Sequence, residues 1–458
     1  MTTVCRRRGA ARAAAAIVLV SSACAAAGGE ERSRDGRPIA TVVASCPMPA
    51  GPLSKATSEE PAVMLGGISD LCVEASADAA GWRRAWVVTD RGPNGTVEVD
   101  GREHRTLATP SFAPRILELA IAWDAGHADR VAVQVTGTTV LHDRDGVPLT
   151  GRPNGLAGDP SMLDPAGRRR IEADPDGVDT EGLVRTRRGT WWLAEEYRPS
   201  LLEADAAGAA RKRFVPGGTS IPGAGMDVVA ALPEVYARRR DNRGFEGLAI
   251  APDDSRLFAV MQSPLEVPDR EEAERTGNVR LLVFDPQAGM PCAEYVYRLG
   301  DPESRSYRKG RSAPDDGKLC AIAALGPTTL LVLEQADGGL ARLYRADLDV
   351  ATDTLPLTRS GGDSPLEAVR DLHAAGVVPV AKTLLADLAP QLGSMRSSAG
   401  LEGDARPLKI EGLAVADERH LFLVNDDDFG VNEDAGGRGV RSCLWVVRLP
   451  APLPFPIP

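Results

Sequence analysis

The chain has 458 residues, of which only 4% are aromatic, and a formal net charge of −11. This length is enough for one large domain, whose core must consist mostly of Ala, Val and Leu. No basic face and no alternation of aromatic and basic residues stands out, which argues against nucleic acid as a partner. The few cysteines exclude a disulfide scaffold.

The first residues predict export. Arginines at positions 6–8 and 12 precede the apolar run Ala13–Val20, which is too short to span a membrane. The sequence that ends at Cys24 resembles a bacterial lipobox, although Ser21 stands where Leu is preferred. Lipidation of Cys24 and ordinary cleavage among the alanines nearby are the two alternatives. A lipid on Cys24 would be the only attachment to a membrane, and the location would be periplasmic, envelope-anchored or extracellular.

These features divide the chain into four parts. We predict a signal peptide over residues 1–23, a flexible tether over 24–37, one domain over 38–449 and a Pro-rich tail over 450–458.

A short motif recurs within the predicted domain. Its template is Phe245-Glu246-Gly247-Leu248, followed by a turn and by a second apolar run that ends at Gln262. Copies begin at Ile410 and Thr180, and degenerate copies begin at Leu319 and Ile68. Short apolar runs bounded by Pro, Asp and Gly are typical of strands joined by tight turns.

Further strand-like runs follow each copy, so that a unit has four strands. Such repeated units predict an all-β fold, namely a β-propeller of five or six four-stranded blades. The sixth blade would lie within Leu141–Val178. The last unit offers only three strands, and the isolated run Ile39–Ser45 is expected to pair with Leu444–Leu449 and close the ring.

Closure by this strand places two cysteines at neighbouring strand ends and predicts a Cys46–Cys443 disulfide. A bridge between Cys292 and Cys320 is a weaker possibility, and Cys72 should be buried and free. Helices are expected over Gly223–Arg240 and Ser364–Ala375.

In a propeller the first strand of each blade lines the central channel, so equivalent positions form a ring. This ring would contain Ser69, Glu181, Glu246, Cys320 and Glu411, and the ends of the second strands would add Asp90, Glu196, Gln262, Gln335 and Asp426. A slip of one residue would instead select Glu195, Glu334 and Asn425.

Carboxylates that face one another repel unless a cation neutralises them, and a set of oxygen ligands suits Ca²⁺ or Mg²⁺. The predicted metal ligands are Glu181, Glu246, Glu411, Asp90, Glu196 and Asp426, with Ca²⁺ as the expected ion. We expect Glu181, Glu246 and Glu411 to converge on one end of the channel. Alternatively, each glutamate accepts backbone hydrogen bonds and only fixes neighbouring blades.

Three arginines lie beside the same turns. Arg91, Arg198 and Arg243 are candidates to bind a phosphate or carboxylate, although each could simply pair with an acidic neighbour. No motif of a serine hydrolase, zinc protease or phosphate loop is present, so catalytic residues remain unassigned.

Several of these segments together resemble the phytase-like domain family, also called esterase-like activity of phytase. The resemblance covers roughly Gly66–Leu449 and is carried by DRGPNG (Asp90–Gly95), EEYRPSLLEAD (Glu195–Asp205), NRGFEGLA (Asn242–Ala249), QSPL (Gln262–Leu265), EYVYRL (Glu294–Leu299), KIEGLAV (Lys409–Val415) and NDDDFG (Asn425–Gly430). The chain departs from the family at Cys320-Ala321, where Ser-Asp is usual, and at Arg198, where Gly is usual.

The resemblance implies a secreted propeller that hydrolyses phosphate esters with the help of a divalent cation. We therefore expect a small-molecule substrate, which may be phosphorylated, and a monomeric protein. Two alternatives stay open: a non-catalytic envelope protein that binds a ligand, and a hydrolase similar to the gluconolactonase propellers, which carry comparable E-G-L and N-D turns around one metal.

Overall fold

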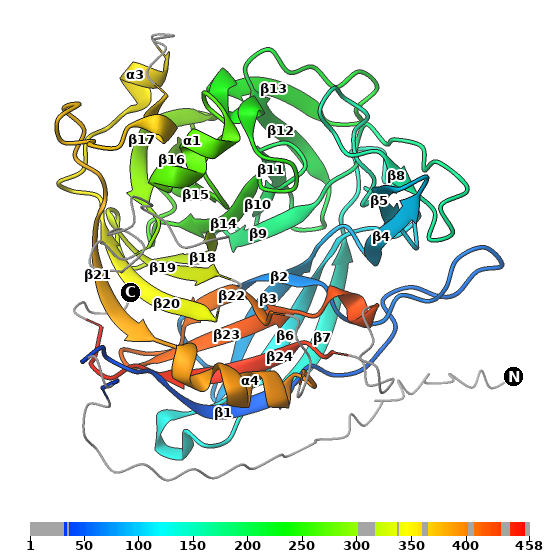
Figure 1. The fold of residues 1–458 in the computed structure, drawn as a ribbon. Coiled ribbons are helices and arrows are strands. Elements are labelled where there is room, and N and C mark those ends of the chain that lie inside the picture. The colour runs from blue at the N-terminus through cyan, green and yellow to red at the C-terminus, as the bar shows by residue number, and fades with distance from the viewer. Residues whose placement is uncertain are drawn as a thin grey trace, which may run out of the picture.

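The computed structural model describes residues 32–33, 36–300, 317–336, 339–359, 365–401, 407–431 and 440–453. The predicted signal peptide and Cys24 lie outside these residues. Sheets, mostly of antiparallel strands, dominate the described chain and helices are few (Figure 1), which confirms the all-β prediction.

Five of the sheets contain one copy of the sequence motif each. Their strands are β2 (Ile68–Val73), β3 (Trp82–Thr89), β6 (Arg115–Ala122) and β7 (Ala132–Val140); β9 (Thr180–Arg185), β10 (Trp191–Glu195), β11 (Ser200–Ala204), β12 (Ala210–Pro216) and β13 (Asp227–Leu232); β14 (Phe245–Ile250), β15 (Leu257–Met261), β16 (Asn278–Asp285) and β17 (Met290–Arg298); β18 (Lys318–Ala324), β19 (Thr329–Ala336), β20 (Leu340–Asp347) and β21 (Ala381–Asp387); and β22 (Lys409–Val415), β23 (His420–Asp426), β24 (Cys443–Arg448) and β1 (Thr41–Pro47).

The motif strands β2, β9, β14, β18 and β22 gather near the middle of the view in Figure 1. Each of them contacts two others: β9 contacts β2 and β14, β18 contacts β14 and β22, and β22 contacts β2. We call these five the inner strands.

The N-terminal strand completes the last sheet, as the sequence predicted. β1 runs antiparallel to β24, with Thr41 opposite Arg448 and Cys46 opposite Leu444. The outer edge of β24 is thereby covered by a strand from the other end of the domain.

The predicted Cys46–Cys443 disulfide is wrong, because both thiols are free. Cys443 lies opposite Pro47, one step away from the pair that Cys46 makes. Successive side chains of a strand point to opposite faces, so the two thiols lie on opposite faces of the sheet. Cys46 packs with Leu444 in one core cluster, and Cys443 packs with Trp445 in another.

The other cysteines are also free. Cys292 is exposed and Cys320 is buried, so the weaker disulfide prediction fails as well. Cys72 is free as expected, but it is only half-buried.

The region that might have held a sixth blade forms a smaller sheet instead. β8 (Met162–Leu163) pairs with the hairpin of β4 (Asn94–Val99) and β5 (Arg102–Leu107), which is inserted between β3 and β6.

Helices are short. They are α1 (Arg270–Thr276), α3 (Leu355–Arg359), α4 (Leu392–Ser398) and the 3-10 turns η1 (Ala125–His127), η2 (Glu234–Arg238), η3 (Leu366–Ala368), η4 (Ala389–Gln391) and η5 (Asp428–Gly430). The helix predicted over Gly223–Arg240 is wrong, since this segment holds β13 and η2, separated by Pro233. Of the helix predicted over Ser364–Ala375, the described residues form only η3. No helix among the described residues is long and apolar enough to cross a membrane.

Candidate functional site

Each inner strand carries a β-bulge at the same place in the motif. The bulged residue has no partner on the neighbouring strand, because the residues on either side of it pair with consecutive residues there. The five bulged residues are Ser69, Glu181, Glu246, Cys320 and Glu411. A bulge redirects the side chain away from its normal alternation. The sequence alignment therefore identified five structurally equivalent positions.

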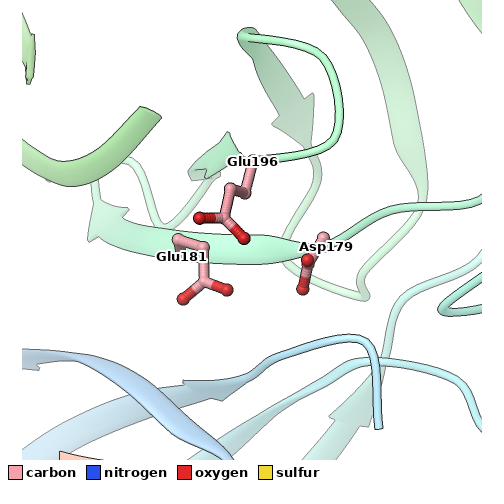
Figure 2. A group of neighbouring side chains, drawn as sticks. All are labelled: Asp179, Glu181 and Glu196. Carbon is pink, nitrogen blue, oxygen red and sulfur yellow. The ribbon is translucent and has the colours of Figure 1, made fainter. Parts of the chain in front are cut away.

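Three carboxylates at this end of the inner strands form a compact group. One oxygen each of Asp179, Glu181 and Glu196 lies within 4.8 Å of the others, and all three residues are buried (Figure 2). Buried carboxylates repel one another unless a cation or a proton neutralises them. This cluster could bind a metal ion, and its oxygen ligands suit a hard divalent cation.

Four glutamates at this end have no partner of their own. Among the described residues, Glu181, Glu196, Glu246 and Glu411 accept no hydrogen bond of normal geometry and form no ion pair, although Glu246 is only 1% exposed. Unpaired buried charges are costly, so the site is poised to take up positive charge.

The same environment disfavours ionisation. Burial, with Glu246 and Asp179 nearby, raises the pKa of Glu196 to about 8. Burial and neighbouring carboxylates also raise the pKa of Glu181 and of Glu411 well above the usual range. For Glu246 burial again raises the pKa, while Lys318, Gln262 and Arg243 act in the opposite direction. Glu246 contributes to the raised pKa of both Glu181 and Glu411. The convergence of Glu181, Glu246 and Glu411 on one end of a channel stays a prediction.

At the ends of the second strands, the residues that contribute to the acidic centre are those that the sequence alignment selected. Glu196 belongs to the three-acid cluster, whereas Asp426 pairs with Lys409 at 2.9 Å. Asp90 accepts a hydrogen bond from the Gly92 backbone at 2.7 Å. Burial, together with Asp426 and Asp179, raises the pKa of Asp90.

The neighbouring residues, which a slip of one residue in the alignment would have selected, make structural contacts instead. Glu195 pairs with Arg213 at 2.9 Å and accepts backbone hydrogen bonds from Asp179, Tyr197 and Arg198. Glu334 accepts hydrogen bonds from Tyr297 and Gly300, and Asn425 accepts one from the Cys443 backbone.

Links between neighbouring sheets come from side chains other than the four unpaired glutamates. Asp70 accepts a hydrogen bond from the backbone of Leu183 on the next inner strand at 2.7 Å. Asp427 accepts one from Gly67 at 2.9 Å, and Gln335 accepts one from Ile410 at 2.9 Å. The alternative in which the ring glutamates fix the sheets through backbone hydrogen bonds therefore does not describe their contacts.

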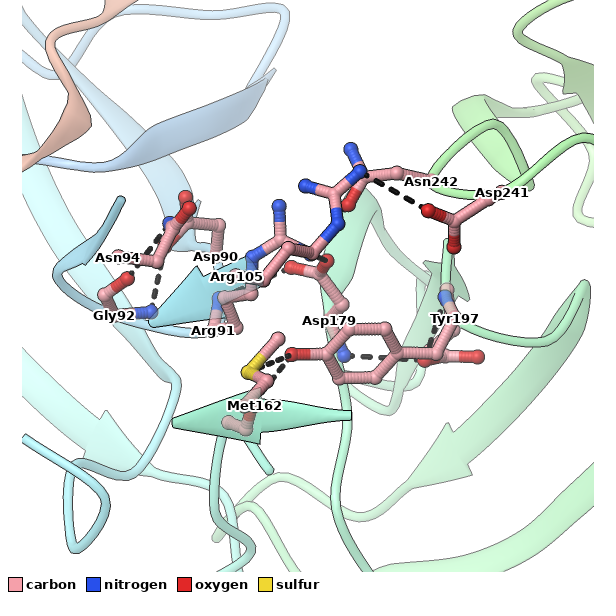
Figure 3. Close-up of polar contacts among 12 residues, drawn as sticks. Asp90, Arg91, Gly92, Asn94, Arg105, Met162, Asp179, Tyr197, Asp241 and Asn242 are labelled. Atoms are coloured by element: carbon pink, nitrogen blue, oxygen red, sulfur yellow. Dashed lines mark hydrogen bonds and ion pairs between the residues drawn. The ribbon is translucent and has the colours of Figure 1, made fainter. Parts of the chain in front are cut away.

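The three predicted arginines have different surroundings. Arg91 is buried, lies 2.5 Å from Asp179 and donates to Asn242 at 2.6 Å (Figure 3). Arg198 is paired with Asp159 at 2.8 Å. Arg243 has no ion pair or hydrogen-bond partner among the described residues, and its Nη1 is buried. Only Arg243 offers an uncommitted guanidinium.

Three charged residues that sequence reasoning missed occupy one further equivalent position. Asp179, Lys318 and Lys409 each precede the bulged residue of their strand by two positions. The corresponding residues directly before β2 and β14 are Gly67 and Gly244. Because acid, base and glycine all occur there, no repeat signal marks this position in the sequence.

The glycine of the motif allows the inner strands to approach one another closely. A Cβ on Gly182 would lie 2.7 Å from Cβ of Leu248 on the adjacent strand. A Cβ on Gly412 would lie 2.9 Å from Cβ of Leu71, and one on Gly247 would lie 3.1 Å from the backbone nitrogen of Ile322.

The residue two positions after each bulged residue is aliphatic, and these side chains separate the acidic end of the inner strands from the opposite end. The five aliphatic side chains there are Leu71, Leu183, Leu248, Ile322 and Leu413. They line a cavity of about 180 Å³ whose other walls are formed by residues further along the same strands.

These features define an all-β protein with a buried acidic centre that could bind a metal ion. Residues 64–429 match the family model described as Phytase-like, esterase-like activity of phytase. Since this match spans well over half of the chain, the protein belongs to that family.

A curated relative is an uncharacterized secreted protein of Arthroderma benhamiae, which is 27% identical over 263 residues. The match covers 49% of this chain and 49% of the relative, so the chain spans about half the length of the relative.

Similarity to solved structures is distant. A luciferin-regenerating enzyme shares 10% identity at a TM-score of 0.33, with 89% of this chain and 98% of the other covered. The PQQ-bound aldose sugar dehydrogenase of Streptomyces coelicolor shares 12% identity at a TM-score of 0.32, with 88% of this chain and all of the other (100%) covered.

Proposed function

We propose that the protein is an exported hydrolase of phosphate esters that uses a divalent cation, most simply Ca²⁺. The observation that carries this proposal is the set of four buried glutamates without partners, two of which, Glu181 and Glu196, form a compact cluster with Asp179. The family membership and the secreted relative support it. A soluble small-molecule substrate and a monomeric protein are part of the same proposal.

We further propose that the five motif-bearing sheets are the blades of a closed five-bladed propeller. The cyclic order of contacts among the inner strands supports this architecture, as does the bulge that recurs in each of them. In this architecture the bulged residues line one mouth of a central channel.

Asp179, Glu181 and Glu196 are the residues that would hold the cation. A bound divalent cation would polarise a phosphoryl oxygen and lower the charge repulsion between substrate and site. Arg91 acts on Asp179 rather than on the substrate, since its guanidinium is already paired with that carboxylate. It fixes the orientation of Asp179.

Glu246 is the carboxylate best placed to accept a proton from an attacking water. It is buried and unpaired, and it lies outside the three-acid cluster while still interacting with it. Arg243 approaches Glu246 and would bind phosphoryl oxygens of the substrate. Glu411, Asp426 and Lys409 are further charged residues of the proposed site, and they interact with one another.

The test is a calcium titration of the purified mature protein, with melting temperature and hydrolysis rate as readouts. Native protein should be stabilised by calcium and should hydrolyse phosphate monoesters in a manner that a chelator abolishes. Glu181→Gln should weaken calcium binding at least about tenfold, since it removes a charged ligand. Glu98→Gln, a change of an exposed acid on β4, is the matched control and should change neither calcium binding nor the rate of hydrolysis.

A carboxyl-ester and lactone panel measured alongside separates the lactonase-type alternative. If native protein shows no calcium response and no hydrolysis, the metal-assisted mechanism fails and a non-catalytic binding role takes its place.

A further inference from the structure

Two positively charged side chains at the acidic end of the inner strands form no direct ion pair with the glutamates near them. Among the described residues, Arg243 and Lys318 form no ion pair and no hydrogen bond through their side chains. The other cations at this end are committed: Arg91 to Asp179 at 2.5 Å, and Lys409 to Asp426 at 2.9 Å and to Asp428 at 2.5 Å.

Lys318 and Lys409 occupy equivalent positions, so the difference between them has a cause in the sequence. Lys409 lies opposite Asp426, and its strand carries Glu411 as the bulged residue. Lys318 lies opposite Gln335, and its strand carries Cys320 at the bulge. The acids at these two positions beside Lys409 are thus replaced by uncharged side chains beside Lys318. The departure of this chain at Cys320 removes a potential metal ligand and leaves Lys318 without a directly paired acid, although Glu411 and Glu246 still act on it.

Backbone hydrogen bonds bring Lys318 close to Arg243. The Gln262 amide donates to the Gly244 carbonyl at 2.9 Å, and the Leu319 amide donates to the Gln262 carbonyl at 3.0 Å. Arg243 and Lys318 directly precede the two ends of this bridge: Arg243 lies two residues before β14, and Lys318 is the first residue of the adjacent inner strand β18. Both side chains lie near Glu246 and Cys320, since both act to lower the pKa of that carboxyl and that thiol.

We propose that Arg243 and Lys318 together form an anion subsite that binds the phosphate group of the substrate. A planar guanidinium and a compact ammonium provide several donors for the oxygens of a tetrahedral oxyanion. The subsite lies beside Asp179, Glu181 and Glu196, so that one substrate group could meet both the pair of bases and a bound cation. The inference rests on the proposed function for its catalytic meaning, and it adds that the substrate must be anionic.

This subsite predicts which of two substrate classes the protein prefers. A neutral carboxylic ester or lactone would leave both half-buried cations without an anion in direct contact, which costs binding energy. A phosphate monoester would neutralise them. The site should therefore discriminate in favour of phosphate monoesters over neutral esters of similar size.

The test is calorimetric titration of the mature protein with inorganic phosphate in the presence of chelator. Native protein should bind phosphate, and Lys318→Gln or Arg243→Gln should each weaken binding about tenfold or more. Lys318→Arg keeps the charge and should remain within about threefold of native affinity. Arg198→Gln is the matched control, because Arg198 is paired with Asp159, and should bind phosphate as the native protein does.

A second variant tests the same idea without removing either base. Cys320→Glu restores the acid found at the bulges of β9, β14 and β22, and should weaken phosphate binding by giving Lys318 a counter-ion. Circular dichroism of each variant verifies folding.

The subsite is overturned if native protein binds no phosphate at millimolar concentration, or if Lys318→Gln binds it as tightly as native protein. Phosphate binding that depends on both bases, without calcium response or hydrolysis, would uphold the subsite and reject the proposed function. Calcium-dependent hydrolysis with unchanged phosphate binding in Lys318→Gln would uphold the proposed function and reject the subsite.

Discussion

Glu195 and Glu196 are consecutive residues with opposite surroundings. Glu195 is paired with Arg213 and accepts three backbone hydrogen bonds, whereas Glu196 has no such partner among the described residues. The reason is that adjacent side chains at the end of a strand point in opposite directions. One acid therefore stabilises the fold, and the other belongs to the site.

This difference predicts how the metal-free protein responds to pH. The pKa of Glu196 rises from 4.5 to about 8 on folding, so between these values the folded state binds more protons than the unfolded state. The contribution to stability is then fully present below about pH 4.5 and is lost as pH rises through 8. The pKa values of Glu181 and Glu411 are also raised in the folded protein, so both residues also make stability fall as pH rises. We expect the free energy of unfolding to fall by on the order of a few kcal/mol from pH 5 to pH 8.

Urea unfolding in the presence of chelator measures this effect. Glu196→Gln should make the loss between the two pH values smaller, while Glu98→Gln should leave it unchanged. A Glu196→Gln profile identical to the native one would show that Glu196 is already ionised in the folded protein.

The inner strands are similar in sequence because each has three tasks. The bulged residue faces the acidic centre, the following residue is glycine on β9, β14 and β22, and the third is aliphatic. At Gly182 a Cβ would lie 2.7 Å from Cβ of Leu248 and 2.9 Å from Cβ of Ala194, so β9 could not keep its distance from β14.

Gly182→Ala should therefore destabilise the protein by about 1–3 kcal/mol, because the strand or its neighbours must shift. Gly393→Ala is the control: Gly393 lies in α4 and a Cβ there would meet nothing within 4 Å. This control should be neutral or stabilising by up to about 1 kcal/mol, since Ala favours helix over Gly. Denaturant unfolding of both variants compares them, and equal stabilities would remove the packing explanation.

The repeat made the inner strands and the ring positions predictable, because every copy except the one that begins at Ile68 keeps nearly the same spacing between the bulge and the end of the second strand. What did not repeat was not predicted. Asp179 and Lys318 share one position with a glycine on β14, so no pattern marked them. β13 was mistaken for a helix, because its apolar residues run into those of η2 at helical spacing. The disulfide failed on a register difference of one residue, which a sequence cannot resolve.

The pairing of β1 with β24 links the two ends of the described domain. Ala44 and Cys46 bury their side chains in the same core cluster as Leu444 and Val446. Without β1, the backbone groups of β24 would form an exposed edge beside an apolar surface, which promotes pairing with other chains.

A chain that starts at residue 48 should therefore lose stability and self-associate, while a chain that starts at residue 38 should behave as the full mature protein does. Melting temperature and size-exclusion chromatography measure the two properties. A synthetic peptide of residues 38–47 should restore both to the shortened chain, because an added strand can pair with a free sheet edge. A chain from residue 48 that remains monomeric with an unchanged melting temperature would show that the last sheet is stable with three strands, and that β1 is dispensable for closing it.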